Sequence, residues 1–439
     1  MIEPPAPRGQ RGIESMETSR TAVPQREGVE ETVARLAREA GFSLSGIAAV
    51  PEPGEGPAAL EGFAVRFSEW VEEGCAAEME YLKRRDEENR LLRSSLRVAF
   101  PWARSVIVCA ANYNAGRAQS IDPSSEGSGW ISRYAWTGYR KEEERGGLPD
   151  SHKTDPAAPA PLQPSDYHTV LLARLKRMEL ALQESMGPFE SRSYVDTGPV
   201  AERVYARQAG LGWTGKNTCL INQEMGSWLF LGVIVTALEP PPSRAPVPNG
   251  GWFDQNHLAP DRCGSCTRCI DACPTGALVA PRQLDARLCI SYLTIEKRGG
   301  IPEPLRAQIG RQVFGCDICQ EVCPWNRKAP LSTDPELALR EELVNPALEW
   351  LAELDAEGFR RLFKYSPLSR TKLRGLLRNV AIAMGNSGLR RYLPRLEKWA
   401  ADDSDPVLAE AAQWAIGRLR EASETITELT PEPASPHAS

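Results

Sequence analysis

The chain has 439 residues, 41% of them hydrophobic, which suffices for two or three domains with at least one large core. Its formal net charge of −6 argues against a surface that binds nucleic acid everywhere. No run approaches the roughly 18 consecutive apolar residues of a membrane helix, and charges stand where a signal peptide would be apolar, so we expect a cytoplasmic protein without membrane contact.

Three segments have a composition that is not expected in the folded core. Residues 1–27 are rich in Pro, Arg, Ser and Glu, and residues 421–439 in Pro, Ser, Thr and Glu, so both ends are expected to be disordered. Between about residues 138 and 164 the chain is rich in Gly, Glu, Lys and Pro. We interpret this third segment as an exposed insertion, because such a composition does not build a core element.

The N-terminal part alternates between helical and extended patterns. Amphipathic periodicity predicts helices, and continuous apolar runs predict buried strands. In chain order, these elements are a helix at residues 28–40, strands near 46–50 and at 105–111, a helix at 167–185 and a strand at 228–236. The alternation favours an α/β domain over residues 28–245, with the insertion inside it.

The C-terminal part reads as helical from about residue 336. Residues 373–384 and 405–419 have the apolar spacing of a HEAT-like helix pair, which places an all-α region at residues 331–420. One such pair cannot bury its apolar face alone, so this region must dock on the preceding domain.

Eight of the eleven cysteines lie between Cys263 and Cys323. Starting at Cys263, the run Cys-x2-Cys-x2-Cys-x3-Cys-Pro is that of two-cluster ferredoxins. Starting at Cys316, the run Cys-x2-Cys-x3-Cys-Pro repeats its last three positions, and Cys289 supplies an eighth thiolate. The spacing predicts a ferredoxin-like module with two 4Fe-4S clusters over residues 246–330.

The last cysteine of such a run binds the other cluster. If each run gives its last cysteine to the other cluster, two ligand sets are predicted. Cluster one would be bound by Cys263, Cys266, Cys269 and Cys323, and cluster two by Cys273, Cys289, Cys316 and Cys319. Structural zinc sites also use Cys-x2-Cys pairs, but they fit the three successive short spacings less well. The remaining Cys75, Cys109 and Cys219 are isolated in the sequence, and we expect them to be buried thiols.

Two further motifs could belong to a redox site. Asp196 ends an apolar strand and is followed by Gly198, a pattern shared by turn formers and catalytic acids. The glycine-rich residues 209–217 either let a large polar cofactor approach the backbone or form a tight turn. No dinucleotide-binding glycine motif follows a predicted strand, and the sequence contains no P-loop.

Together these motifs resemble the epoxyqueuosine reductase family, over roughly residues 28–420. The resemblance rests on Val195-Asp-Thr-Gly-Pro-Val-Ala-Glu-Arg203, Ala209-Gly-Leu-Gly-Trp-Thr-Gly-Lys-Asn217, residues 263–274, Cys289-Ile-Ser-Tyr-Leu-Thr294 and residues 314–326. It implies a cobalamin-dependent oxidoreductase that removes the epoxide oxygen of epoxyqueuosine at the wobble position of tRNA. An unidentified low-potential electron donor would supply the electrons, and a monomer is the default expectation.

The resemblance also implies roles for individual residues. Asp196 matches the proton donor, with a pKa that burial against the corrin would raise. The implied cobalamin contacts are Arg90, Ser132, Asp196, Asn217, Leu220, Leu231, Ser291 and Asp317. His168 lies in a motif that the family shares, and we expect it to be structural.

The C-terminal region carries the basic residues expected of a tRNA contact. Residues 364–398 contain nine basic residues and one acid, Glu397. Such an excess of basic residues is typical of a surface that binds a polyanion, although a basic run can also be a solvated helix face. The expected contacts are Arg370, Lys372, Arg374 and Arg378, with Lys297 near the clusters.

Two other functions explain part of the sequence. A reductive dehalogenase also combines cobalamin with two clusters, but Arg8 and Arg11 are followed by no apolar export segment. A noncatalytic electron carrier explains the clusters but leaves Asp196 and the basic region without a role. Failure to bind a corrinoid would favour the carrier.

Overall fold

The computed structural model describes residues 28–51, 58–137, 139–141, 162–164, 166–240 and 259–428. The disorder expected for residues 1–27, and most of the predicted insertion, lie outside the described residues. The expected start of the C-terminal tail at residue 421 is wrong, because helix α14 (Pro406–Glu428) continues through it. Residues 421–428 contain neither Gly nor Pro, so nothing in them stops the helix.

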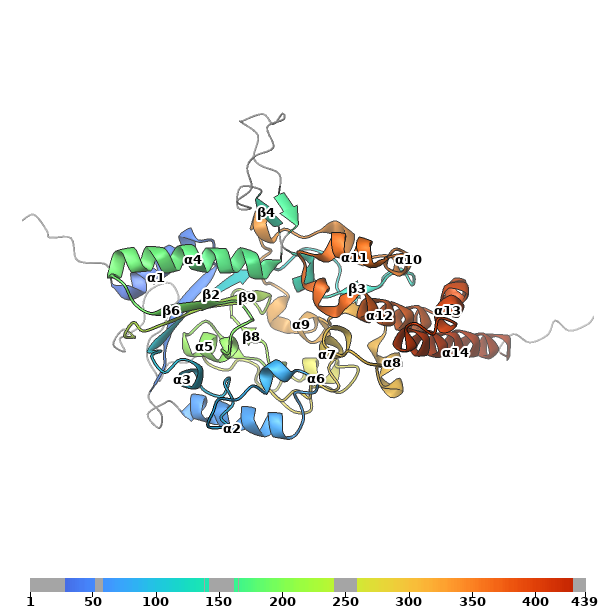
Figure 1. The fold of residues 1–439 in the computed structure, drawn as a ribbon, viewed down its shortest axis with the longest axis horizontal. Coiled ribbons are helices and arrows are strands. Elements are labelled where there is room, and N and C mark those ends of the chain that lie inside the picture. The colour runs from blue at the N-terminus through green and yellow to red at the C-terminus, as the bar shows by residue number, and fades with distance from the viewer. Residues whose placement is uncertain are drawn as a thin grey trace, which may run out of the picture.

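A four-stranded sheet forms the centre of the N-terminal domain (Figure 1). Its order is β1 (Leu44–Ala49), β2 (Ser105–Asn112), β9 (Leu229–Thr236) and β6 (Ser191–Tyr194), and every neighbouring pair is antiparallel. All eight residues of β2 are buried. A strand in the middle of a sheet that is covered on both faces requires such a continuous apolar sequence.

Helices cover both faces of this sheet. Helices α1 (Val29–Glu39) and α4 (Tyr167–Met186) pack on one face against Ile107 and Ile234. Helix α5 (Glu202–Gln208) packs on the other face against Val106 and Val233. Alternate strand residues thus enter opposite cores, as the pleat requires. Helices on both faces of the sheet agree with the predicted layers, and Figure 1 shows α4 and α5 on opposite sides of the sheet. The antiparallel pairing differs from the mostly parallel sheet typical of the α/β class.

The cysteine-rich module is built from short helices. They are α6 (Arg268–Asp271), α7 (Ile290–Ile295), α8 (Glu303–Ile309) and α9 (Ile318–Glu321). Strand β10 (Gln312–Phe314) of this module pairs in parallel with β3 (Trp130–Ile131) of the first domain. Backbone hydrogen bonds therefore join the module to the N-terminal domain.

The remaining elements complete the two ends of the molecule. They are α2 (Ala58–Glu72), α3 (Leu96–Ala99), β4 (Tyr139–Lys141), β5 (Leu162–Pro164), β7 (Trp213–Thr214), β8 (Leu220–Ile221), α10 (Leu348–Ala352), α11 (Ala356–Phe363), α12 (Lys372–Asn386) and α13 (Leu393–Ala400). Strands β4 and β5 pair with each other where the insertion leaves and rejoins the domain.

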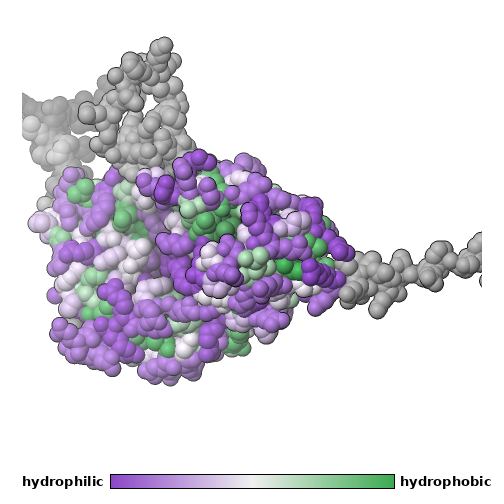
Figure 2. Space-filling model, turned by 45° about the vertical axis from the view of Figure 1, so that its right-hand side comes forward, coloured by the Kyte–Doolittle hydropathy of each residue, from purple (hydrophilic) through white to green (hydrophobic). Residues whose placement is uncertain are grey.

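The C-terminal helices share one core with the cysteine-rich module. Helix α12 packs against α14, the pair that the sequence predicts, and its buried Val380 belongs to the same apolar cluster as Ile290 and Val313. The expected docking is thus present. On the face seen in Figure 2, hydrophobic residues form scattered patches among hydrophilic ones, and no helix of the described chain has the length and apolarity needed to span a bilayer.

Candidate active site

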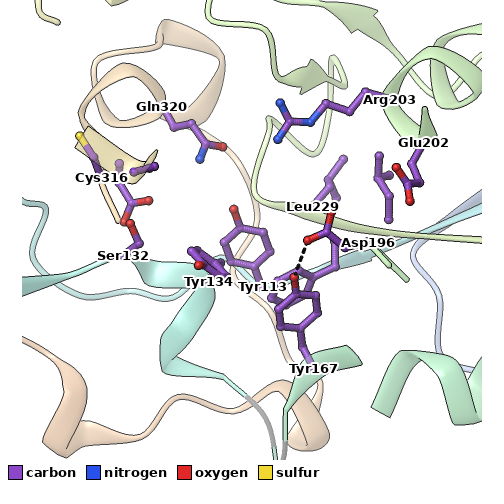
Figure 3. A pocket seen from close by; sticks show the side chains of 14 residues that line it. Tyr113, Ser132, Tyr134, Tyr167, Asp196, Glu202, Arg203, Leu229, Cys316 and Gln320 are labelled. Atoms are coloured by element: carbon purple, nitrogen blue, oxygen red, sulfur yellow. Dashed lines mark hydrogen bonds between the residues drawn. The ribbon is translucent and has the colours of Figure 1, made fainter. Parts of the chain in front are cut away.

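A cavity of about 280 Å³ lies where the sheet meets the cysteine-rich module (Figure 3). This volume is near the lower end of the roughly 300–1,000 Å³ typical of small-molecule sites, and the cavity opens to the surface. Its walls come from β9, α5 and the segments around β3, α7 and α9. The lining residues are Tyr113, Ser132, Tyr134, Tyr167, Asp196, Glu202, Arg203, Leu229, Phe230, Leu231, Ser291, Cys316, Asp317 and Gln320.

Asp196 occupies a strained turn directly after β6. Its φ of +55° lies in the left-handed region, which non-glycine residues adopt rarely and often at functional sites. The turn leaves the carboxylate side chain 61% exposed, facing the cavity. The hydroxyl of Tyr167 donates a hydrogen bond to Oδ2 of Asp196 over 3.5 Å, drawn as the dashed line in Figure 3. Asp196 is therefore a turn residue whose carboxylate faces the cavity.

His168 connects Asp196 to a second carboxylate. Its Nδ1 lies 2.5 Å from Oδ1 of Asp166, the N-cap of α4, and its Nε2 lies 3.8 Å from Oδ2 of Asp196. Desolvation lowers the pKa of His168, but the hydrogen bond to Asp166 and the charges of Asp166 and Asp196 outweigh it and raise the pKa to about 9. The imidazole is thus positively charged at neutral pH. The geometry gives His168 an electrostatic role in the cavity beyond the structural one expected.

The pKa of Asp196 is shifted in the opposite direction to the one expected. Desolvation alone would raise it, but the nearby positive charges of His168, Arg203 and Arg370 lower it below its ordinary value. Asp196 is therefore a carboxylate at neutral pH in this state, paired with a protonated histidine. The two groups share one available proton and titrate as a pair.

Glu202 is a second acid in the same cavity. Burial raises its pKa to about 7, and the charge of Asp196 adds to the rise. Its Oε1 is buried without a hydrogen-bond partner among the described residues. A carboxyl group in this setting keeps its proton close to neutral pH. Beside it on α5, Arg203 donates from Nη1 to the Thr218 carbonyl over 3.2 Å.

The wall beside the module is held by Asp317, whose carboxylate accepts the backbone N–H of Arg133 over 2.7 Å. Burial raises the pKa of Asp317, and the hydrogen bond from Arg133 partly counters the rise. Next to it, Gly315 has φ +70°, and a Cβ there would lie 2.2 Å from Oγ of Ser132. Only glycine permits this approach of the module to Ser132.

The structure gathers four of the implied cofactor contacts other than Asp196 in the cavity wall, namely Ser132, Leu231, Ser291 and Asp317. Leu220 and Asn217 lie behind it: Leu220 is buried in the core under α5, and Asn217 donates to the Cys319 carbonyl over 3.1 Å. Arg90 lies away from the cavity, in a surface turn, paired with Asp86 and Glu88.

The glycine-rich residues 209–217 form a tight hairpin. A Cβ on Gly212 would lie 2.2 Å from the carbonyl oxygen of Ile221 in β8. The close approach is thus to the chain itself, and no residue of this run belongs to the described wall of the cavity. Of the two interpretations left open by the sequence, the turn is the one that the structure favours.

The eight cysteines fall into two groups in space. Burial raises the pKa of Cys323 to about 11, and the nearby thiols of Cys263 and Cys269 add to the rise. Burial likewise raises the pKa of Cys316, where Cys289 and Cys273 add to it. Within the described chain no three such side chains stand close enough for a single metal ion, and a cubane spaces its four ligands more widely. Among the eight cysteines, these neighbours belong to the same predicted set in each case, and Cys219, outside both sets, also lies near Cys319 and Cys323.

The other three cysteines differ in burial. Cys75 and Cys109 are buried, as expected. The side chain of Cys109 lies 3.8 Å from the sulfur of Met178, inside the core between the sheet and α4. Cys219 is only partly buried, in the hairpin near Arg203.

One predicted polyanion contact is contradicted. Arg378 is fully buried, and its guanidinium donates to the carbonyls of Leu293, Lys297 and Gly299 over 2.7–2.8 Å. It ties α12 to the cysteine-rich module and cannot reach a phosphate. A count of charges along a sequence does not tell which helix face each side chain occupies, and this one faces inward.

The other predicted basic residues lie nearer to solvent. Lys297 pairs with Glu78, Arg374 pairs with Asp405 over 2.8 Å, and Lys372 is exposed. Arg370 pairs with Glu296 over 2.6 Å and is near enough to lower the pKa of Asp196. Arg370 is therefore the one among them at the cavity.

Sequence reasoning missed several residues around the cavity. Tyr81 is 40% exposed, and its ring lies 5.2 Å from the guanidinium of Arg370 and 5.9 Å from that of Arg93. Arg93 donates to the Val200 carbonyl and acts on the pKa of Glu202. The motif at residues 195–203 already contained Glu202 and Arg203, so its last two residues were the overlooked signal.

Two family models match the chain. The 4Fe-4S double cluster binding domain matches residues 262–326, and "Epoxyqueuosine reductase QueG, DUF1730" matches residues 93–140. The curated epoxyqueuosine reductase of Xanthomonas campestris pv. campestris is 36% identical over 388 residues, which cover 87% of this chain and 94% of the relative. That of Pseudomonas aeruginosa is also 36% identical, over 87% of this chain and 92% of the relative.

Solved structures agree with these matches. A crystal structure of an epoxyqueuosine reductase with an epoxyqueuosine-modified tRNA-Tyr stem loop aligns at a TM-score of 0.70 and 27% identity, covering 92% of this chain and 94% of that one. A Bacillus subtilis epoxyqueuosine reductase, whose aspartate-bearing catalytic loop is swung out of the active site, aligns at 0.69 and 26% identity, covering 92% and 94%.

Proposed function

Because the chain belongs to the epoxyqueuosine reductase family, we propose that it reduces the epoxide of epoxyqueuosine in tRNA to the alkene of queuosine. The reaction consumes two electrons and two protons, and releases the epoxide oxygen as water. The observation that carries the proposal is one cavity that contains both Asp196 and Cys316 of the second cysteine set. A proton source and an electron source thus meet at the same place.

The eight cysteines would hold the clusters in the two predicted sets, with Cys323 crossing to the first and Cys273 to the second. The match to a double-cluster domain supports two clusters, and the grouping of the thiols supports the exchange. The second set would deliver electrons to the cavity, because Cys316 and its neighbour Asp317 line it.

Cobalamin is the proposed cofactor in the cavity. The lining residues fit such a group: Leu229, Phe230 and Leu231 offer an apolar surface, while Ser132, Ser291 and Gln320 offer polar groups to its rim. When bound, it would supply a low-potential cobalt centre beside the substrate. The described cavity accounts for part of its volume, so the remainder would occupy the open side.

The proton chemistry would lie with this chain's own residues. Asp196 would take a proton from His168, which is protonated at neutral pH, and pass it to the departing epoxide oxygen. Glu202, with its pKa near 7 and its unpartnered oxygen, would hold the second proton. General acid catalysis of this kind contributes roughly 10²–10⁴-fold to rate.

The substrate nucleotide would enter from the side of Arg370 and Arg93. For a nucleotide turned into a cavity, the flanking phosphates lie at the mouth, where guanidinium groups can bind them. Arg370 near Asp196, Arg93 near Glu202 and the exposed Lys372 would take these roles. Arg378, which the sequence suggested, would contribute only by holding α12 in place.

The test is an anaerobic assay with cluster-reconstituted protein, cobalamin, a low-potential reductant and epoxyqueuosine-containing tRNA, with nucleosides measured by mass spectrometry. We expect queuosine to appear only when cobalamin is present. No conversion by protein with intact clusters and bound corrinoid would refute the proposal.

A further inference from the structure

The two cysteine sets have different surroundings. The second set borders the Asp196 cavity through Cys316, whereas no cysteine of the first set belongs to the described wall of that cavity. Cys263, Cys266 and Cys269 are instead partly exposed, and the residues between them are exposed. An electron from outside the chain therefore meets the first set before the second.

Basic residues surround the first set. Six basic and three acidic residues lie within five positions of Cys263, Cys266, Cys269 or Cys323 or contact that segment, a net charge of +3 in a chain of net charge −6. The basic residues are Lys216, Arg262, Arg268, Arg282, Arg327 and Lys328; the acidic ones are Asp261, Asp271 and the buried Glu321. We call the six basic residues the basic rim.

Short-range contacts place the rim around the cysteines. Lys216 donates from Nζ to the carbonyl of Gly264 over 2.7 Å, and Arg282 pairs with Asp261, two residues before Cys263. Arg262 and Arg268 are direct sequence neighbours of two cysteines, and Arg327 and Lys328 follow the last cysteine of the set within five residues. Within the residues that the structure describes, Arg262, Arg268, Arg327 and Lys328 form no ion pair, and all four are exposed.

A mostly apolar hollow of about 430 Å³ adjoins the rim, and its charged lining residues, Arg66, Glu69, Glu73 and Arg282, balance to zero net charge. Phe63, Phe67 and Trp70 of α2 line it from one side, and Val279, which is 58% exposed, lines it from the other. Arg282 belongs both to the hollow and to the rim. Figure 1 shows α2 and α6 on the same side of the molecule. An apolar centre beside a charged rim is the usual anatomy of a protein–protein contact.

We infer that the basic rim and this hollow form the docking surface for a small, acidic, one-electron carrier protein. The inference rests on the proposed function, because that reaction needs two electrons from outside. Each docked carrier would be oxidised by one electron, which enters at the first cysteine set and passes to the second. Two successive carriers supply the pair consumed with two protons when the epoxide becomes an alkene and water.

The partner class follows from charge. An acidic protein is attracted to a basic surface, and complementary charge raises association rates roughly 10- to 10³-fold while allowing rapid release. Small, transient contacts of this kind are typical of electron-transfer pairs. A nucleic acid would also be attracted, but the hollow offers an apolar contact that phosphates do not use.

The experiment follows cluster reduction in the reconstituted holoenzyme by stopped-flow absorbance, with a recombinant acidic flavodoxin in its fully reduced form as the probe. We expect the second-order rate to fall as salt is raised. The triple variant Arg262→Glu, Arg268→Glu, Lys328→Glu should be reduced at least about tenfold more slowly at low salt, and salt should no longer slow it. Val279→Gln should slow reduction and leave its salt dependence as in the wild type.

The matched control is Arg38→Glu with Arg192→Glu, two exposed residues on α1 and β6, which should keep the wild-type rate and salt dependence. Cluster content and the extent of reduction by dithionite should be equal in all variants. A triple variant that is reduced at the wild-type rate would overturn the inference. The inference would also be overturned if the triple variant bound a tRNA stem loop more weakly while the carrier reduced it at the wild-type rate. That result would show that the surface binds RNA. Epoxide reduction driven by a chemical reductant tests the proposed function separately.

Discussion

Nε2 of His168 lies 3.8 Å from Oδ2 of Asp196, while Nδ1 of the same ring contacts Asp166. The imidazole thus stands between two carboxylates that raise its pKa to about 9, against the effect of desolvation. A group with a raised pKa keeps its proton below that value and loses it as the pH rises through it. The proton that Asp196 would give to substrate is therefore stored next to it throughout the neutral range.

The His168→Asn variant should lower the turnover number by roughly 10- to 100-fold, because Asp196 loses its resupply. The wild-type rate should also decline above about pH 9, where His168 loses its proton, and the variant should lack this decline. A pH–rate profile under single-turnover conditions measures both. If the variant keeps the wild-type alkaline limb, His168 does not supply the proton.

Replacing Asp196 by Asn should reduce turnover by about 10²–10⁴-fold, because the amide cannot protonate the departing oxygen. Cluster absorbance and corrinoid binding should stay as in the wild type, since the side chain points into the cavity and supports no core contact. Asp196→Glu serves as the control that retains the acid. Wild-type turnover by the Asn variant would show that another group donates.

Glu202→Gln should remove an inflection near pH 7 from the pH–rate profile. Burial and the charge of Asp196 raise the pKa of Glu202 to about 7, so its stored proton is lost as the pH rises through that value. The amide keeps the size of the side chain, and the rate should fall by about 100-fold, at the low end of the usual contribution of a general acid. An unchanged inflection in the variant would assign it to a different group.

Arg370→Gln and Arg378→Met should separate RNA contact from stability. Arg370→Gln should reduce the salt slope of tRNA binding by about one unit, with unchanged unfolding. Arg378→Met should leave that slope unchanged and lower the free energy of unfolding by about 1–3 kcal/mol, because three carbonyls lose their donor. Filter binding at several salt concentrations and urea unfolding measure the two effects. If Arg378→Met instead reduced the salt slope and left unfolding unchanged, Arg378 would be an RNA contact.

Cys323→Ser and Cys289→Ser should each damage one cluster. If the ligands exchange as proposed, Cys323→Ser affects the cluster beside Cys263, and Cys289→Ser affects the one beside the cavity. Iron content should fall from about eight atoms to about four in each variant. Only the variant at Cys289 should alter the spectrum of bound corrinoid. Identical spectra in both variants would argue against the proposed assignment.

Local sequence was sufficient for some of these features. The apolar run of β2 predicted a strand buried on both faces. The cysteine spacing predicted which thiols are neighbours because it matches a known two-cluster pattern, in which the last cysteine of each run binds the other cluster. The strand order β1-β2-β9-β6 could not be predicted from the sequence, because an apolar run does not show which strand pairs with it. The resemblance to the epoxyqueuosine reductase family was what assigned Asp196 to the active site.

What packs against each residue limited the rest. Arg378 and Arg374 are four residues apart in the same basic stretch, yet one is fully buried and the other is exposed. Arg90 pairs with acids in its own turn, whereas Arg93, three residues later, lies near Glu202. A one-dimensional count of charge treats such residues alike, and only the packing of the surrounding elements distinguishes them.

Strands β4 and β5 pair at the base of the predicted insertion, with Tyr139 opposite Pro164. On either side of this pair, Tyr134 and Tyr167 meet edge to face in the cavity wall, with ring centroids 6.1 Å apart. The two tyrosines are therefore joined through a short ladder instead of through the length of chain between them. The predicted insertion can therefore change in length or sequence during evolution without moving the wall of the cavity.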